Sequence, residues 1–134
     1  MLDRDIIQSV GVRNVVADGR TTGFRFELRM PNYRGVWGSL IDGVAVTVGD
    51  LSWARDVALW TLQGRTFTAQ QLRESDREVR WQLDEPAVIT VPHEGGLPVG
   101  VHRLQVDIAI HAPYIPAEFQ PSVFHAEREV VVVS

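Results

Sequence analysis

Four histidines are the side chains of this sequence best suited to hold a metal or move a proton. They are His93, His102, His111 and His125, the first three spaced nine residues apart. Zinc or manganese sites usually contain at least one locally built pair of ligands, on one helical turn or at alternate positions of a strand. No two of these histidines are that close, so we expect ordinary surface or edge residues. A metal site assembled from three separate strands is the alternative.

Acidic residues cluster three times along the chain without forming an obvious acid–base pair. The clusters are Asp3 and Asp5, then Glu74, Asp76 and Glu78, then Asp84 and Glu85. General acid–base catalysis needs two environments that push the pKa values of the two groups apart. The second cluster lies among arginines in strongly polar sequence, which is typical of a solvated face.

Two further motifs fail as catalytic or phosphate-binding signatures. Ser39 in "WGSLID" lacks the strand-to-helix elbow of a GxSxG nucleophile and has no evident histidine partner. The glycines of "EGGLP" do not open a helix after a strand, so a phosphate cradle is not expected. We therefore assign no catalytic, cofactor-binding or metal-binding residue to this chain.

The elements that must position these residues show alternation of apolar and polar side chains. Segments 23–29, 43–48, 78–84 and 102–111 each alternate with a period of two, which predicts strands covered on one face. The expected inward side chains are Phe24, Phe26, Leu28, Val44, Val46, Val48, Val79, Trp81, Leu83, Leu104, Val106, Ile108 and Ile110. Trp53 and Trp60 have no clear place in these patterns, and we expect them to cover the sheet edge.

Turn signals separate the predicted strands. Asp18–Gly19 predicts a tight hairpin, because a type I′ turn needs positive φ at two successive residues, and Gly49–Asp50 closes another. Thr68 with Gln71 predicts a capping box at the start of one short helix. Together these features predict an all-β fold: an antiparallel β-sandwich with one short helix, spanning residues 1–134 as a single domain. An open barrel is the alternative.

Composition narrows the possible partners. The chain has 13 basic and 17 acidic residues, a net charge of -4 and no cysteine. This weakly acidic balance argues against affinity for nucleic-acid phosphates or anionic lipid. No apolar run approaches the roughly 18 residues of a membrane-spanning helix, and the first residues do not resemble a signal peptide. We expect a cytoplasmic protein that binds neither nucleic acid nor membrane.

Two proline-interrupted segments display large side chains outside the predicted strands. They are "RMPNYRGVW" (29–37) and "HAPYIPAEFQPSV" (111–123), and their prolines prevent regular strand pairing. Tyrosine, tryptophan and arginine are the residues that most often anchor protein interfaces. We therefore predict a partner interface that contains Tyr33, Arg34, Trp37, Tyr114 and Ile115. The alternative is that these loops fold back and cap the ends of the sandwich.

Four stretches of the chain together carry a family resemblance. They are residues 1–50, "ALWTLQGRTFTAQQL" (58–72), "EPAVITVPHEGGLPVGVHRLQVDIAI" (85–110) and "PYIP" (113–116). Across nearly its whole length the chain resembles the small (β) subunit of bacterial C-glycoside deglycosidases. None of the four stretches is a catalytic signature in itself.

The resemblance implies a division of labour between two polypeptides. The large (α) subunit of that family is a TIM barrel that carries a divalent metal, typically manganese, and a histidine base. Its substrate is a C-glycoside of a flavonoid or related aromatic compound, oxidised at the 3-position of the sugar. The resemblance implies that this chain is a β-sandwich with no cofactor of its own, bound beside the barrel in a hetero-oligomeric lyase. Two rival functions are a stand-alone small β-fold metal enzyme and a carbohydrate-binding module.

Overall fold

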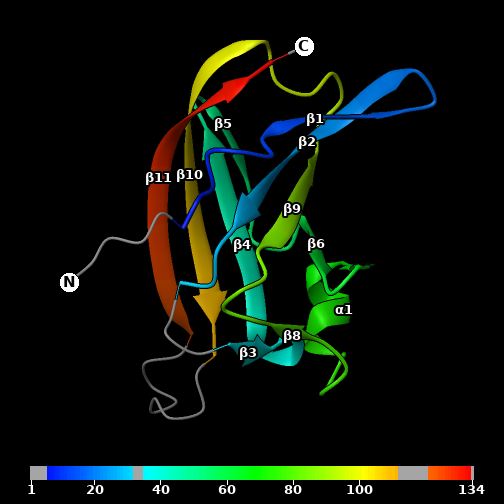
Figure 1. Cartoon of the computed structure of the whole chain (residues 1–134), viewed down its shortest axis with the longest axis vertical. Coiled ribbons are helices and arrows are strands. Elements are labelled where there is room, and N and C mark those ends of the chain that lie inside the picture. The colour runs from blue at the N-terminus through cyan, green and yellow to red at the C-terminus, as the bar shows by residue number, and fades with distance from the viewer. Residues whose placement is uncertain (1–5, 32–34, 112–120, 134) are drawn as a thin grey trace.

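The computed structural model describes residues 6–31, 35–111 and 121–133, which form two large antiparallel sheets and one small one (Figure 1). The five-stranded sheet has the order β1 (Arg13–Ala17), β2 (Arg20–Leu28), β9 (Ala87–Pro92), β6 (Leu59–Leu62) and β7 (Arg65–Phe67). The four-stranded sheet has the order β11 (Ser122–Val132), β10 (Gly100–Ile110), β4 (Ile41–Val48) and β5 (Leu51–Trp53). The small sheet pairs β3 (Val36–Trp37) with β8 (Arg80–Trp81).

The two large sheets bury their facing side chains in one shared core cluster. Phe24, Phe26 and Leu28 of β2 join Leu104 and Val106 of β10 in this cluster, each 1% exposed or less. The alternation of burial along β2, β4 and β10 is the one that the sequence predicts for strands covered on one face. The prediction of an all-β antiparallel sandwich with one short helix is confirmed.

The short helix and two hairpins form as their local sequences require. Helix α1 (Ala69–Arg73) begins with a full capping box: the Gln71 amide donates to Thr68 Oγ1 at 3.1 Å, and the Thr68 amide donates to Gln71 Oε1 at 2.9 Å. Asp18 and Gly19 both have positive φ in the β1–β2 turn, as predicted. Gln63 and Gly64 do the same between β6 and β7, a hairpin that the sequence analysis missed.

Two expectations about apolar residues were wrong. Leu83, expected in the core, is 40% exposed because β8 ends at Trp81 and residue 83 lies in the following turn. Trp60, expected at a sheet edge, is completely buried and packs edge-on against Trp81 with ring centroids 5.3 Å apart. Trp53 is half-buried on the edge strand β5, in line with its prediction.

An irregularity near the start of β4 shapes one end of the sandwich. Ala109 pairs with Gly43 and Ile110 with Ile41, so Asp42 is an extra residue on β4, as in a β-bulge. Gly43 has a φ of 142°, and a Cβ built there would lie 2.3 Å from the carbonyl oxygen of Arg55. That oxygen accepts a hydrogen bond from the Val44 amide at 3.1 Å. The segment around Arg55 can therefore cross β4 only where the strand has no side chain.

Among the described residues, no helix is long and apolar enough to cross a membrane.

Candidate functional site

Trp37, one of the five predicted interface residues, lies half-buried on β3 at one end of the sandwich. Its cross-strand neighbour is Arg80 of β8, whose guanidinium carbon lies 5.2 Å from the centroid of the indole ring. The same guanidinium donates to the carbonyl oxygen of Gly35 at 3.2 Å. A cation–π contact and a backbone bond thus hold Trp37 with part of its ring open to solvent.

The other four predicted interface residues, Tyr33, Arg34, Tyr114 and Ile115, lie outside the described residues. The described residues next to them meet at the Trp37 end of the molecule (Figure 1). The His111 amide, at the end of β10, donates to the carbonyl oxygen of Leu40 at 2.8 Å. Leu40 closes η1 (Gly38–Leu40), the 3₁₀ turn that directly follows Trp37, so the end of the first predicted segment lies close to the start of the second.

We call this region the loop end and define it by Trp37, Arg80, Asp42, Arg55 and His111. The bulge in β4 directs the Asp42 carboxylate toward Arg55, with Oδ2 and Nη1 2.7 Å apart. His111 Nε2 lies 3.7 Å from the other carboxylate oxygen. These charged residues are far apart in sequence and meet only through the bulge, which is why sequence reasoning missed them.

The remaining histidines are scattered over the sandwich. The ring of His93 packs edge-on against Trp53, with centroids 5.4 Å apart, and His102 Nε2 lies 2.6 Å from the carbonyl oxygen of Pro98. Within the described parts of the chain, no three histidine, cysteine or acidic side chains are grouped so that they could hold a metal ion.

His125 belongs to a charged network on the solvent face of β10 and β11. Its Nδ1 lies 2.7 Å from Asp107 Oδ1, and its Nε2 lies 2.9 Å from Glu127 Oε2. Glu127 also accepts a bond from Arg103 at 2.6 Å. The hydrogen bond to Glu127, then that to Asp107, raises the pKa of His125, because both carboxylates stabilise the imidazolium. The bonds from His125 and Arg103 lower the pKa of Glu127.

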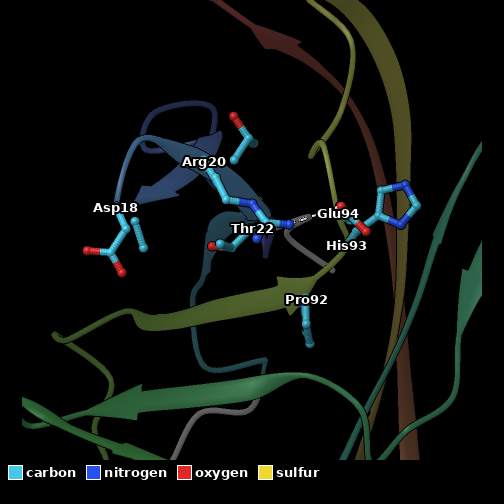
Figure 2. Close-up of a pocket in the computed structure, with 8 residues that line it drawn as sticks. Asp18, Arg20, Thr22, Pro92, His93 and Glu94 are labelled. Carbon is cyan, nitrogen blue, oxygen red and sulfur yellow. Dashed lines mark hydrogen bonds and ion pairs between the residues drawn. The ribbon is translucent and has the colours of Figure 1, made fainter.

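A shallow cleft of about 530 Å³ lies between the β1–β2 hairpin and the end of β9 (Figure 2). Asp18, Arg20, Thr22, Pro92, His93 and Glu94 are among its lining residues. Arg20 and Glu94 point toward one another across it, with Nη2 and Oε1 3.1 Å apart, and both side chains are more than 70% exposed. An ion pair so open to water is weak and polarises its surroundings little. The cleft therefore offers exposed polar and charged side chains from the hairpin and from the end of β9.

Comparison with known proteins assigns the chain to a family. Residues 2–114 match the family model described as C-glycoside deglycosidase beta subunit. A protein of that name from Eubacterium cellulosolvens is 35% identical over 120 residues, which cover 89% of this chain and 81% of the relative. Another from Arthrobacter globiformis is 34% identical over 118 residues, 85% of this chain and 82% of the relative. The chain therefore belongs to the C-glycoside deglycosidase beta-subunit family.

Proposed function

We propose that this chain is the accessory subunit of a heteromeric, cytoplasmic C-glycoside deglycosidase. The observation that supports the proposal most directly is the family match over residues 2–114, since that family is named for a subunit of this enzyme. The partner in this proposal is a TIM-barrel α subunit that holds a divalent metal, manganese, and carries out the chemistry. This chain supplies no catalytic residue and contributes a surface.

The proposed reaction is a lyase step on a C-glycoside of an aromatic aglycone, such as a flavonoid, whose sugar is already a ketone at C3. The ketone acidifies the neighbouring C2 proton, so a base can remove it. The electron pair left at C2 forms the double bond to C1, the bond from C1 to the aglycone breaks, and the aglycone carbon takes up a proton. A metal ion in the α subunit would stabilise the oxyanion charge that develops at C3. This route needs no pair of glycosidase carboxylates.

The loop end is the surface that we propose for contact with the α subunit. Trp37 is held in place by Arg80 yet is half-exposed, which suits an anchor that loses little conformational freedom on binding. Tyr33, Arg34, Tyr114 and Ile115 complete the proposed contact. The Asp42–Arg55 ion pair and His111 border it and supply a polar rim.

Co-expression with the α subunit tests this proposal. The Trp37→Ala/Tyr114→Ala variant should lose co-purification of the α subunit, or should keep the complex with a reduced kcat. Val16→Ala is the matched control, because Val16 is 65% exposed on β1, in the hairpin away from the loop end. Thermal unfolding of each isolated chain separates loss of binding from loss of folding. A stable, fully active complex with the double variant would show that the loop end is not the contact surface.

A further inference from the structure

The four outer strands of the two large sheets differ in how well they resist pairing with another strand. β5 and β7 have three residues each, and β1 has five with a shift of register between Val15 and Val16. β11 has eleven residues and pairs with β10 in unbroken register from Ser122 to Val132. Short or bulged strands are the usual protection of a sheet edge. Among the outer strands that the structure describes, β11 is therefore the longest, and its pairing with the neighbouring strand is unbroken.

The sequence of β11 contains the charged residues Glu127, Arg128 and Glu129, but it has no proline, and the whole chain contains no lysine. Its inward side is closed by the core and by Arg128, which donates to the carbonyl oxygen of Ile7 at 3.0 Å. Its outward side chains, from Val123 to Val131, are all exposed. An edge of this length and regularity is suited to bind another strand.

We infer that two copies of this chain pair antiparallel through β11, centred on Glu127, and join their four-stranded sheets into one continuous sheet. This inference does not rest on the proposed function. The occupant is a second copy because the strand is complementary to itself in this register. On the solvent face, Val123 of each copy lies opposite Val131 of the other, and His125 lies opposite Glu129 of the other. Apolar pairs and opposite charges in facing positions both stabilise a sheet.

The charges around Glu127 support the register in which the two Glu127 residues face one another. Two Glu127 carboxylates would face one another there, a like-charged pair that destabilises an antiparallel sheet unless it is neutralised. Each Glu127 is already bonded to Arg103 at 2.6 Å and to His125 at 2.9 Å, so two guanidinium groups, and two imidazolium groups when His125 is protonated, surround the two carboxylates. Moving the register two residues toward the C-terminus would place Glu127 opposite Glu129 twice. That arrangement would bring two more carboxylates together without matching cations.

Disulfide trapping in the full-length chain tests the register directly, since the chain has no cysteine of its own. Facing residues of antiparallel strands have Cα atoms about 4.5–5.5 Å apart, within disulfide range. Val123→Cys and Val131→Cys should each stay uncrosslinked alone, because position 123 of one copy lies about 26 Å from position 123 of the other. An equal mixture of the two variants should form a covalent dimer under mild oxidation.

Val101→Cys is the matched control for this experiment. Val101 is 64% exposed and is the cross-strand neighbour of Val131, but it lies on β10, one strand in from the edge. Its mixture with Val123→Cys should not crosslink, because the extra strand spacing of about 5 Å puts the thiols out of reach. Equal crosslinking of both mixtures would overturn the inference, since it would indicate random collision.

Sedimentation of the uncrosslinked chain provides a second test. Glu129→Arg should weaken the dimer roughly tenfold, because it replaces two opposite-charge pairs with like-charge pairs. Asp50→Arg, the same change of charge in an exposed turn, should leave the dimer constant unchanged. A chain that is monomeric at its highest soluble concentration, or a dimer that Glu129→Arg does not weaken, would overturn the inference.

Discussion

His125 is a histidine whose two ring nitrogens both lie within hydrogen-bonding distance of carboxylates, Asp107 at 2.7 Å and Glu127 at 2.9 Å. Both nitrogens can donate only when the ring is protonated, so the folded chain favours the imidazolium. The sequence identified His125 as a candidate ligand or surface residue, but not this pairing. Asp107 lies 18 residues away, and the register of β10 with β11 decides that the two meet.

His125→Ala should therefore change how stability depends on pH. In the unfolded chain the histidine titrates near 6.5, and in the folded chain its pKa is higher. The stabilisation is thus complete below about pH 6.5 and is lost as the pH rises through the folded pKa. Because the side chain is about half-exposed, we expect the variant to be less stable by under about 1 kcal/mol at pH 5.5. At pH 9 it should match the parent.

Urea unfolding at the two pH values measures this difference, and NMR titration of the ring protons locates the pKa. Asp107→Asn is the control, because it keeps the shape of the side chain and removes one charge, so the pKa of His125 should fall. A pH-independent difference between His125→Ala and the parent would contradict the assignment.

The bulge in β4 brings Asp42 and Gly43 close to Arg55 at the loop end. Gly43 has a φ of 142°, and the Arg55 carbonyl oxygen lies where a side chain at this position would be. Gly100, at the start of β10, has a similar φ of 135°, but nothing lies within 4 Å of the position where its Cβ would be. A side chain would strain the backbone at either position, but only at Gly43 would it also collide with a neighbouring atom, the Arg55 carbonyl oxygen.

Gly43→Ala should therefore destabilise the fold more than Gly100→Ala. The strained backbone should cost roughly 1–3 kcal/mol in both variants. Only Gly43→Ala should also displace the segment around Arg55 and break its hydrogen bond to Val44. The difference in free energy of unfolding between the two variants measures that contact. Equal losses of stability would show that backbone strain alone requires glycine at position 43.

The capping box of α1 permits a second prediction for an element. Thr68→Ala removes the acceptor for the Gln71 amide and should cost about 1 kcal/mol. Thr68→Ser keeps the hydroxyl and should retain most of the stability. Denaturant unfolding of the pair measures the effect, and the same loss in both variants would show that the methyl group of Thr68, rather than the cap, stabilises the helix.

Elements were predictable from the sequence where a local rule governs them. Alternation located β2, β4 and β10, and the spacing of Thr68 and Gln71 located α1. The turn at Gln63–Gly64 was missed because glutamine is not a usual residue at positive φ. The bulge at Asp42 was missed because it depends on which strand lies beside β4.

At the scale of the whole molecule, one apolar core joins the two large sheets. Leu104 lies in it with 1% exposure, whereas Leu83, of the same type and predicted for the same environment, is 40% exposed. Alternation alone could not separate them, because it carries no information on where a strand ends. The same limit applies to the predicted interface, which stays a prediction: composition selected Trp37, and the fold adds that Arg80 contacts its ring.

Leu104→Ala should lower the free energy of unfolding by about 2–5 kcal/mol, through lost burial and the cavity that remains. Leu83→Ala should change it by no more than about 0.5 kcal/mol. Chemical denaturation of the two variants measures the contrast. A large loss in Leu83→Ala would mean that the turn after β8 packs more tightly than its exposure indicates.

The unequal strand lengths of the four-stranded sheet limit how far an assembly through β11 can grow. Once two copies have joined, each remaining outer strand of the joined sheet is β5, with only three residues. A third copy would find too few backbone groups there to add. Assembly through this sheet therefore closes as a two-fold symmetric pair and does not extend into a filament.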